Sequence, residues 1–196
     1  MAETSVASLD PRLQKQVESA RVAYGRGNFD FTVSLCRSIL KENPSCVSVR
    51  KLHREAALRL HHGSGSPFAL ELGPRLDFPV PSKPATSQGL APLDALDTSE
   101  EMIEENPHNP EALRILSRAA AALSWRETTI YACESLREES PRDLENLVLL
   151  GEALIAAGRF DQAGEAARQA LRVDATSDRA LAVLNAASLS QPARSA

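Results

Sequence analysis

The chain has 196 residues, of which 43 % are hydrophobic, so it is long and apolar enough to bury a core, which excludes an intrinsically disordered protein. Only 4 % of the residues are aromatic, whereas alanine and leucine are abundant, and this composition favours packed helices over a sheet. A formal net charge of −4 at pH 7 disfavours a protein that binds nucleic acid through a generally basic surface.

Targeting and membrane signals are lacking in the sequence. The N-terminus has no positively charged region followed by an apolar stretch, so no secretory signal is predicted. No apolar run approaches the roughly 20 residues that span a bilayer. We therefore expect no integral membrane segment and a cytoplasmic location.

The first helical pair is predicted near the N-terminus. We expect residues 1–10, which are small and polar, to be flexible, and Asp10 followed by Pro11 indicates the start of a helix. This helix should end at Tyr24, before a glycine-rich turn, and a second should run from Phe29 to Glu42. Residues 13–46 then form one repeat.

The next unit contains a long interruption. A helix is expected over 47–60, but the prolines and glycines within 61–92 forbid a long helix there, and helical character resumes near Leu93. Pro44 and Pro107 each follow an asparagine that closes a helix, and their separation clearly exceeds one period of about 34 residues. We therefore predict a second repeat over 47–109 with an insertion of about 29 residues within 61–92, which restores the period.

Regular helix-turn-helix units follow over 110–143 and 144–177. Leu147 and Leu150 become Leu113 and Leu116 when the sequence is shifted back by one period. A period of about 34 residues that contains a helix pair predicts a solenoid. The helix expected over 178–190 would cap its last apolar face, before a flexible tail at 191–196.

At this point the chain resembles the tetratricopeptide repeat family. The matching positions are Gly27, Asn28, Phe29, Asp30, Ile39 and Pro44 in the first repeat, Leu116, Thr129, Cys133, Leu136 and Pro141 in the third, and Leu150, Gly151, Ala163, Ala167 and Ala170 in the fourth. Ala20, Ser117 and Ala175 depart from the family pattern. The resemblance implies an all-α, right-handed α-solenoid of about four repeats plus a capping helix, whose first helices line a concave groove for a peptide or partner helix.

On that template, several side chains of the first helices should face the groove. The candidate partner-binding residues are Arg21, Lys51, Glu55, Arg59, Arg114, Arg118 and Glu152. The cations could form a stripe for an acidic peptide, because hydrogen bonds to carboxylates are strong when charged. The favoured alternative is a solvated helix face whose cations pair internally with acidic neighbours.

Two further features have open interpretations. Trp125, in the turn of the third repeat, could contact a partner or pack against the insertion. Within the insertion, residues 67–81 are apolar enough to dock on the fold, whereas 82–91 are expected to be mobile, and a spacer that does not dock is the alternative.

No residue pattern in the sequence predicts catalysis or metal binding. The three cysteines and four histidines lack metal-ligand spacing, and no nucleophile lies in a known catalytic pattern, so we expect no metal, cofactor or enzymatic activity. Buried thiols account for the cysteines, with Cys46 the most exposed.

The sequence therefore predicts a non-enzymatic scaffold or adaptor that binds a protein or peptide partner and no nucleic acid. The partner could be acidic, and homo-oligomerisation through repeat ends stays open. The alternative function is a membrane-associated or secretion-linked assembly factor recruited through the insertion at 61–92.

Overall fold

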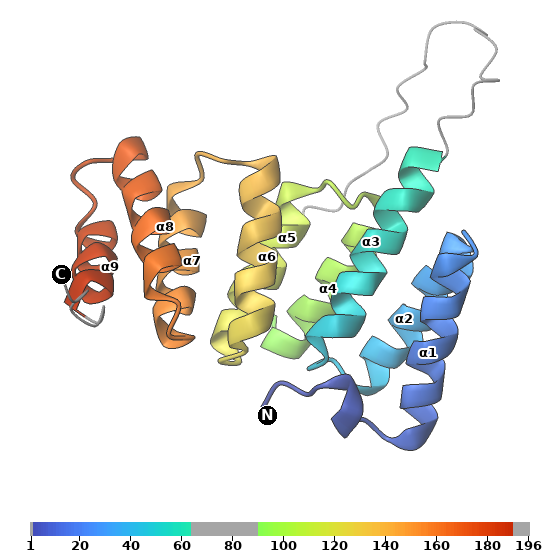
Figure 1. Ribbon diagram of the computed structural model, residues 1–196. Coiled ribbons are helices and arrows are strands. Elements are labelled where there is room, and N and C mark those ends of the chain that lie inside the picture. Colours follow the sequence, from blue (N-terminus) through green and yellow to red (C-terminus); the bar gives the residue numbers. More distant parts are fainter. Residues whose placement is uncertain (1, 64–89, 190–196) are drawn as a thin grey trace, which may run out of the picture.

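The computed structural model describes residues 2–63 and 90–189, and every regular element in these ranges is helical (Figure 1). The elements are η1 (Val6–Ser8), α1 (Pro11–Gly25), α2 (Phe29–Glu42), α3 (Val47–Gly63), α4 (Pro92–Glu105), α5 (Pro110–Ala122), α6 (Arg126–Glu139), α7 (Leu144–Ala156), α8 (Phe160–Val173) and α9 (Asp178–Leu189). The helices follow one another across the molecule as in an α-solenoid, which is the predicted fold class.

The helices begin and end at the residues that the local chemistry favours. The side chains of Asp10, Asn28 and Asn109 accept hydrogen bonds from backbone amides in the first turns of α1, α2 and α5. Gly27 and Gly158 adopt φ values of +77° and +74° in the turns that follow α1 and α7. The two glycine turns fold α2 back along α1 and α8 back along α7.

The helices from α5 to α9 pack as successive helical hairpins. Each helix packs along its neighbour in sequence, and α9 contacts both α7 and α8. Small residues allow close approach, as at Gly151, where an added Cβ would lie 2.6 Å from Cγ1 of Val183. The last helix therefore covers the apolar faces of the hairpin that precedes it.

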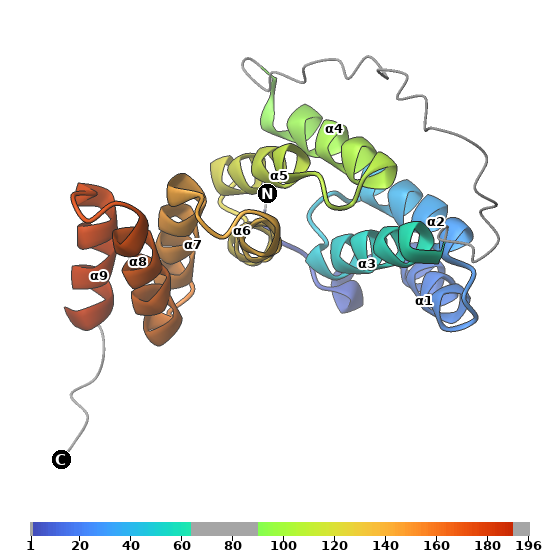
Figure 2. The ribbon, with the colours of Figure 1, turned by 90° about the horizontal axis from the view of Figure 1, so that it is seen from above.

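The second predicted repeat differs from a helical hairpin. Arg50 of α3 contacts Glu100 of α4, while His53 and His61, further along α3, contact Glu104, further along α4. The two helices therefore run in the same direction (Figure 2). As a consequence, α3 packs mainly along α2, and α4 packs mainly along α5.

The apolar core is divided at the same place. One pair of clusters lies within η1 to α3 and includes Leu13, Val17, Ile39 and Cys46. The remaining clusters, which contain residues such as Leu116, lie within α4 to α9. In the part of the chain that the structure describes, no cluster of buried apolar residues spans the two bodies. Cys46 is fully buried in the first, so the expectation that it is the most exposed cysteine is wrong.

The N-terminal segment makes specific contacts with both bodies over the described part of residues 1–10, the range predicted to be flexible. Thr4 donates from its backbone amide to the carbonyl of Ser45 over 3.1 Å, and Leu9 is buried against the first body. Further along the molecule, the carboxylate of Glu3 accepts hydrogen bonds from the backbone amides of Glu127 and Thr128 at the start of α6. The segment therefore bridges the two bodies. Composition alone did not reveal these partners, because they lie far away in sequence.

Candidate functional site

A shallow depression lies on the seam between α5 and α7, two of the helices predicted to line the groove. Its volume is about 300 Å³. The residues that line it are Ala121, Ser124, Arg126, Thr129, Leu149, Glu152, Ala153 and Ala156. Four of the eight residues are apolar, and three of these are alanines, while two are charged. We call this feature the seam depression.

Charged side chains of the predicted groove form ion pairs between helices that lie two elements apart. Nη2 of Arg118 lies 2.6 Å from Oε2 of Glu145, and Nη2 of Arg179 lies 2.9 Å from Oε1 of Glu152. Each pair joins a helix to the one two elements further along, with partners 27 residues apart. Exposed pairs of this kind contribute only about 0–1 kcal/mol to stability, and they already occupy the charges that a partner would have to contact.

Arg114 pairs with two carboxylates, whereas Arg118 pairs with one. Its Nη2 lies 2.8 Å from Oδ2 of Asp143, and its Nη1 lies 2.5 Å from Oε2 of Glu111. The hydrogen bond to Asp143 raises the pKa of Arg114. Burial raises the pKa of Asp143, but the backbone amide of Asn146 and the guanidinium of Arg114 together lower it. Both groups are therefore charged and paired at neutral pH.

The groove candidates nearer the N-terminus lie apart from this row. Nζ of Lys51 lies 5.4 Å from the centre of the Tyr131 ring, and Glu55 accepts a 2.8 Å hydrogen bond from the hydroxyl of Tyr24. Arg21 and Arg59 are exposed on α1 and α3. Arg114, Arg118 and Glu152 thus each contact an oppositely charged side chain of another helix or turn.

Trp125 does not offer a surface to a partner. Its side chain is only 1 % exposed and packs in the cluster formed by α4, α5 and α6, with Leu96 and Leu116 among its members. The candidate assignment of Trp125 as a partner contact is therefore corrected. Its backbone holds the N-cap position of α6, while its indole fills the interior. The insertion, the alternative packing partner of this side chain, lies mostly outside the described residues.

A second feature, not predicted, is the polar junction between the two bodies. Arg37 of α2, whose side chain is only 9 % exposed, lies 2.7 Å from a carboxylate oxygen of Asp97 and 3.0 Å from one of Glu101. Its Nε lies 3.3 Å from Oε1 of Glu104. One buried cation on the first body thus meets three carboxylates on α4.

Arg54 makes a similar connection further along α3. Its guanidinium donates to the carbonyl of Pro107 over 3.1 Å, to Oγ of Ser135 over 3.2 Å and to Oε1 of Glu139 over 3.3 Å. These partners belong to the α4–α5 turn and to α6. The junction therefore extends from α4 to α6, and it consists of polar contacts along this length.

The centre of the junction is a buried ion cluster. Nε of Arg50 lies 2.5 Å from Oε1 of Glu100, and Nδ1 of His53 lies 2.9 Å from Oε2 of the same carboxylate. The side chains of Arg50, His53 and Glu100 are 1 %, 0 % and 2 % exposed, respectively. A second carboxylate, that of Glu104, lies 3.1 Å from Nε2 of His53. Charges this deeply buried are tolerated because each has an opposite charge in contact.

The pairing determines the protonation states of His53 and Glu100. Burial alone lowers the pKa of His53, but the neighbouring carboxylates of Glu100 and Glu104 raise the pKa to about 9. Burial alone raises the pKa of Glu100, but the charge of Arg50 and the contact with His53 lower it to about 2. The cluster therefore holds an imidazolium and a carboxylate at neutral pH.

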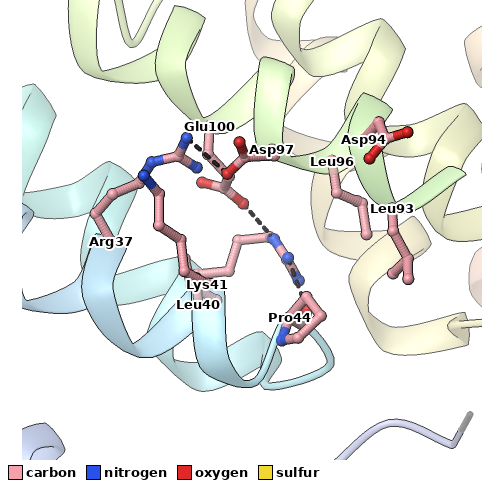
Figure 3. A pocket seen from close by; sticks show the side chains of 10 residues that line it. Arg37, Leu40, Lys41, Pro44, Leu93, Asp94, Leu96, Asp97 and Glu100 are labelled. Atoms are coloured by element: carbon pink, nitrogen blue, oxygen red, sulfur yellow. Dashed lines mark hydrogen bonds and ion pairs between the residues drawn. The ribbon is translucent and has the colours of Figure 1, made fainter. Parts of the chain in front are cut away.

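A pocket of about 410 Å³ opens beside this cluster, between the end of α2 and the start of α4 (Figure 3). Its lining combines apolar side chains with equal numbers of cations and carboxylates: Leu40, Pro44, Leu93, Leu96, Arg37, Lys41, Arg50, Asp94, Asp97 and Glu100. The dashed contacts in Figure 3 join Arg37 to Asp97 and Arg50 to Glu100, and Arg50 also donates to the carbonyl of Pro44. The pocket therefore offers a ligand no net charge.

The sequence contained a weak signal for the junction. Arg50, His53 and Arg54 follow the i, i+3, i+4 spacing of one helix face, and Glu100 and Glu104 share a face of the other helix. Such charges ordinarily indicate a solvated surface. Only the direction of α4 shows that the two faces meet.

Neither a metal site nor a membrane span is found in the ranges 2–63 and 90–189. Within them, no group of three histidine, cysteine, aspartate or glutamate side chains is placed to hold a metal ion. No helix of these ranges is both long enough and apolar enough to cross a bilayer. The insertion invoked for membrane recruitment lies almost entirely between the two ranges.

The described helices define a helical-repeat protein of the α-solenoid class. No family model and no curated protein matches the chain. Among solved structures, the crystal structure of the MamA protein is similar, with a TM-score of 0.50 and 17 % sequence identity over 91 % of this chain and 81 % of that one. A thermophilic TPR protein of Thermus thermophilus, TTC0263, matches with a TM-score of 0.43 and 18 % identity over 91 % of this chain and 82 % of that one. The resemblance to the tetratricopeptide repeat family is confirmed as a likeness of fold.

Proposed function

We propose that the chain is a non-enzymatic scaffold or adaptor that binds a peptide or helix of a protein partner along the seam between α5 and α7. The observation that carries the proposal is the seam depression, where the small side chains of Ala121, Ala153 and Ala156 leave room beside Leu149. Protein interfaces commonly have an apolar centre with a polar rim, and here Glu152 and Arg126 supply the rim.

The neighbouring ion pairs bear on the kind of partner. Arg114 and Arg118 already contact carboxylates of the following repeat, so a partner that relied on them would have to displace those carboxylates. An apolar side chain inserted into the seam depression needs no such exchange. We therefore infer that an apolar anchor, rather than an acidic stripe, provides the main contact at this face.

The test begins with the identification of a partner by co-purification and mass spectrometry, followed by measurement of its affinity. Ala156→Lys places a long charged side chain at an exposed position of the seam depression, and we expect it to weaken binding at least about tenfold. Ala182→Lys, at an exposed position of α9, is the matched control. Equal affinities of the two variants would contradict binding at the seam.

The groove cations are tested separately. Reversal of both Arg114 and Arg118 to glutamate should have a smaller effect than Ala156→Lys if the apolar anchor dominates. Loss of binding in the double reversal alone, in protein that remains folded, would instead show that an acidic partner uses these cations.

A further inference from the structure

A second groove lies between the C-terminal ends of α6 and α8, which reach the same edge of the molecule (Figure 1). Its volume is about 750 Å³. The residues that line it are Arg137, Pro141, Arg142, Gln169, Arg172 and Val173. Three of the six are arginines and none is acidic. We call it the arginine groove.

The arginines of this groove differ from those of the α5–α7 face in their pairing. Arg172 lies 3.4 Å from Glu165, a carboxylate that also pairs with Arg168 at 3.1 Å. Within the described residues, neither Arg137 nor Arg142 has a carboxylate within ion-pair distance. The groove therefore has an excess of positive charge on a chain whose formal net charge is −4.

Helix ends account for only part of this arrangement. Arg137 and Arg172 lie in the last turns of α6 and α8, where the terminal carbonyl groups favour a cation. Arg142 lies outside both helices, in the turn before α7, and it is exposed. Arg142 therefore adds a third guanidinium to the groove, and the carbonyl groups of a helix end do not explain its presence there.

We propose that the arginine groove binds an acidic peptide segment of a protein partner. Each guanidinium presents a planar fork of donors that matches a carboxylate, and its charge does not depend on pH in the physiological range. Pro141 and Val173, which is 42 % exposed, provide apolar contact for the aliphatic parts of the peptide. The volume lies within the range of about 300–1,000 Å³ that is typical of ligand sites.

A peptide suits the groove better than a nucleic acid does. Phosphate backbones are bound through a long track of cations, with about 6–10 contacts in typical DNA-binding proteins. The arginine groove offers three arginines on a chain that is acidic overall. A short segment with two or three carboxylates matches this number. The proposal concerns a different edge from the seam depression and does not depend on it.

The experiment uses the full chain and a fluorescently labelled peptide of alternating glutamate and leucine, with the glutamine–leucine peptide as the neutral probe. Anisotropy titrations should show binding of the acidic peptide, weakened by added salt, and little binding of the neutral one. Arg137→Glu with Arg142→Glu should lower the affinity at least about tenfold. Arg137→Gln with Arg142→Gln should also lower it, which separates the lost contacts from new repulsion.

The matched control is Arg12→Glu with Arg26→Glu, two exposed arginines of the first body whose reversal changes the net charge equally. Equal weakening by this control would overturn the proposal, because it would reveal a general charge effect. Weakening by Arg114→Glu with Arg118→Glu alone would overturn it by placing the peptide on the α5–α7 face. Tighter binding of a single-stranded oligonucleotide than of the acidic peptide would overturn the choice of partner. Ala156→Lys should leave the peptide affinity unchanged, so this result is separable from the test of the seam depression.

Discussion

Nε of Arg50 lies 2.5 Å from Oε1 of Glu100, and this buried contact joins two bodies whose apolar cores are separate. Buried ion pairs cost desolvation energy that apolar contacts do not, so a junction of this kind adds less net stability than a continuous core. It does fix the relative position of the bodies, because any displacement would leave charges buried without partners. The pair therefore acts in positioning α4 against α3.

Removal of the central charge is the most direct test of the junction. Glu100→Gln leaves Arg50 and His53 buried without their common carboxylate, and we expect the free energy of unfolding to fall by about 3 kcal/mol. Urea denaturation monitored by circular dichroism measures this loss. The control is Glu145→Gln, which removes the exposed partner of Arg118 and should cost about 1 kcal/mol or less. Comparable losses for the two variants would refute the special role of the buried cluster.

The same cluster predicts how stability depends on pH. The pKa of His53 is raised from 6.5 to about 9, so its contribution is complete below about pH 6.5 and is lost as pH rises through about 9. The pKa of Glu100 is lowered from 4.5 to about 2, so its contribution is complete above about pH 4.5 and is lost as pH falls through about 2. We expect the cluster to contribute most between about pH 4.5 and 6.5.

Thermal unfolding at a series of pH values checks this dependence. The unfolding temperature of the natural protein should decline from about pH 6.5 towards pH 9, and His53→Gln should flatten that decline while lowering stability at pH 6. His108→Gln, at a histidine whose side chain is 48 % exposed, should leave the decline in place. An unchanged decline in His53→Gln would assign the pH dependence to other groups.

The contact of Glu3 with α6 predicts that the N-terminal segment contributes to stability. Its carboxylate accepts hydrogen bonds from the amide of Glu127 over 2.9 Å and from the amide and hydroxyl of Thr128 over 2.7 Å each. A carboxylate at a helix N-terminus satisfies free amides and the helix dipole, so Glu3→Gln should cost about 1 kcal/mol. Chemical denaturation measures this cost. Glu18→Gln, at an exposed position of α1, is the control, and an equal effect would show that Glu3 acts through net charge alone.

The contrast between Leu150 and Glu100 shows what could be predicted from the sequence. Leu150 repeats Leu116 after one period, and periodic apolar positions indicate both the helices and their inward faces. Glu100 follows an insertion that interrupts the period, so periodicity contains no information on the direction in which α4 runs. Without that direction, a glutamate 50 residues after Arg50 looks like any solvated charge.

The candidate site divides in the same way. The helix face that carries Arg114, Arg118 and Glu152 was predictable from the repeat template, since each residue occupies a known place on its helix. The ion pairs that neutralise these residues depend on side-chain reach between repeats, which spacing alone does not specify. Of the two interpretations of Trp125, contact with a partner is wrong, because its side chain is buried in a cluster with residues of α4 and α5.

Ser124 predicts a stabilising substitution. It adopts φ of +60° at the turn position where Gly158, one period later, adopts +74°. A residue with a Cβ is strained in this region, and the side chain of Ser124 is exposed, so Ser124→Gly should raise the free energy of unfolding by about 0.5–1 kcal/mol. Gly158→Ser is the converse variant and should lower it by a similar amount. Destabilisation by Ser124→Gly would show that the serine makes a contribution larger than the strain.

Gly151 predicts the opposite effect, because α7 and α9 approach each other closely at this residue. A Cβ built at Gly151 would lie 2.6 Å from Cγ1 of Val183, a distance at which the valine side chain or one of the helices must shift. Val183 is branched at Cβ and only 4 % exposed, so it has little freedom to move away. Gly151→Ala should therefore cost about 1–3 kcal/mol of unfolding free energy, despite the better helix propensity of alanine. Gly25→Ala, where no atom lies within 4 Å of the added Cβ, should not destabilise the protein.

The double variant tests whether the two side chains compete for space. Adding Val183→Ala to Gly151→Ala creates the missing space, so the double variant should lose less stability than the two single losses combined. Strict additivity in urea denaturation would mean that the two side chains do not compete for the same volume.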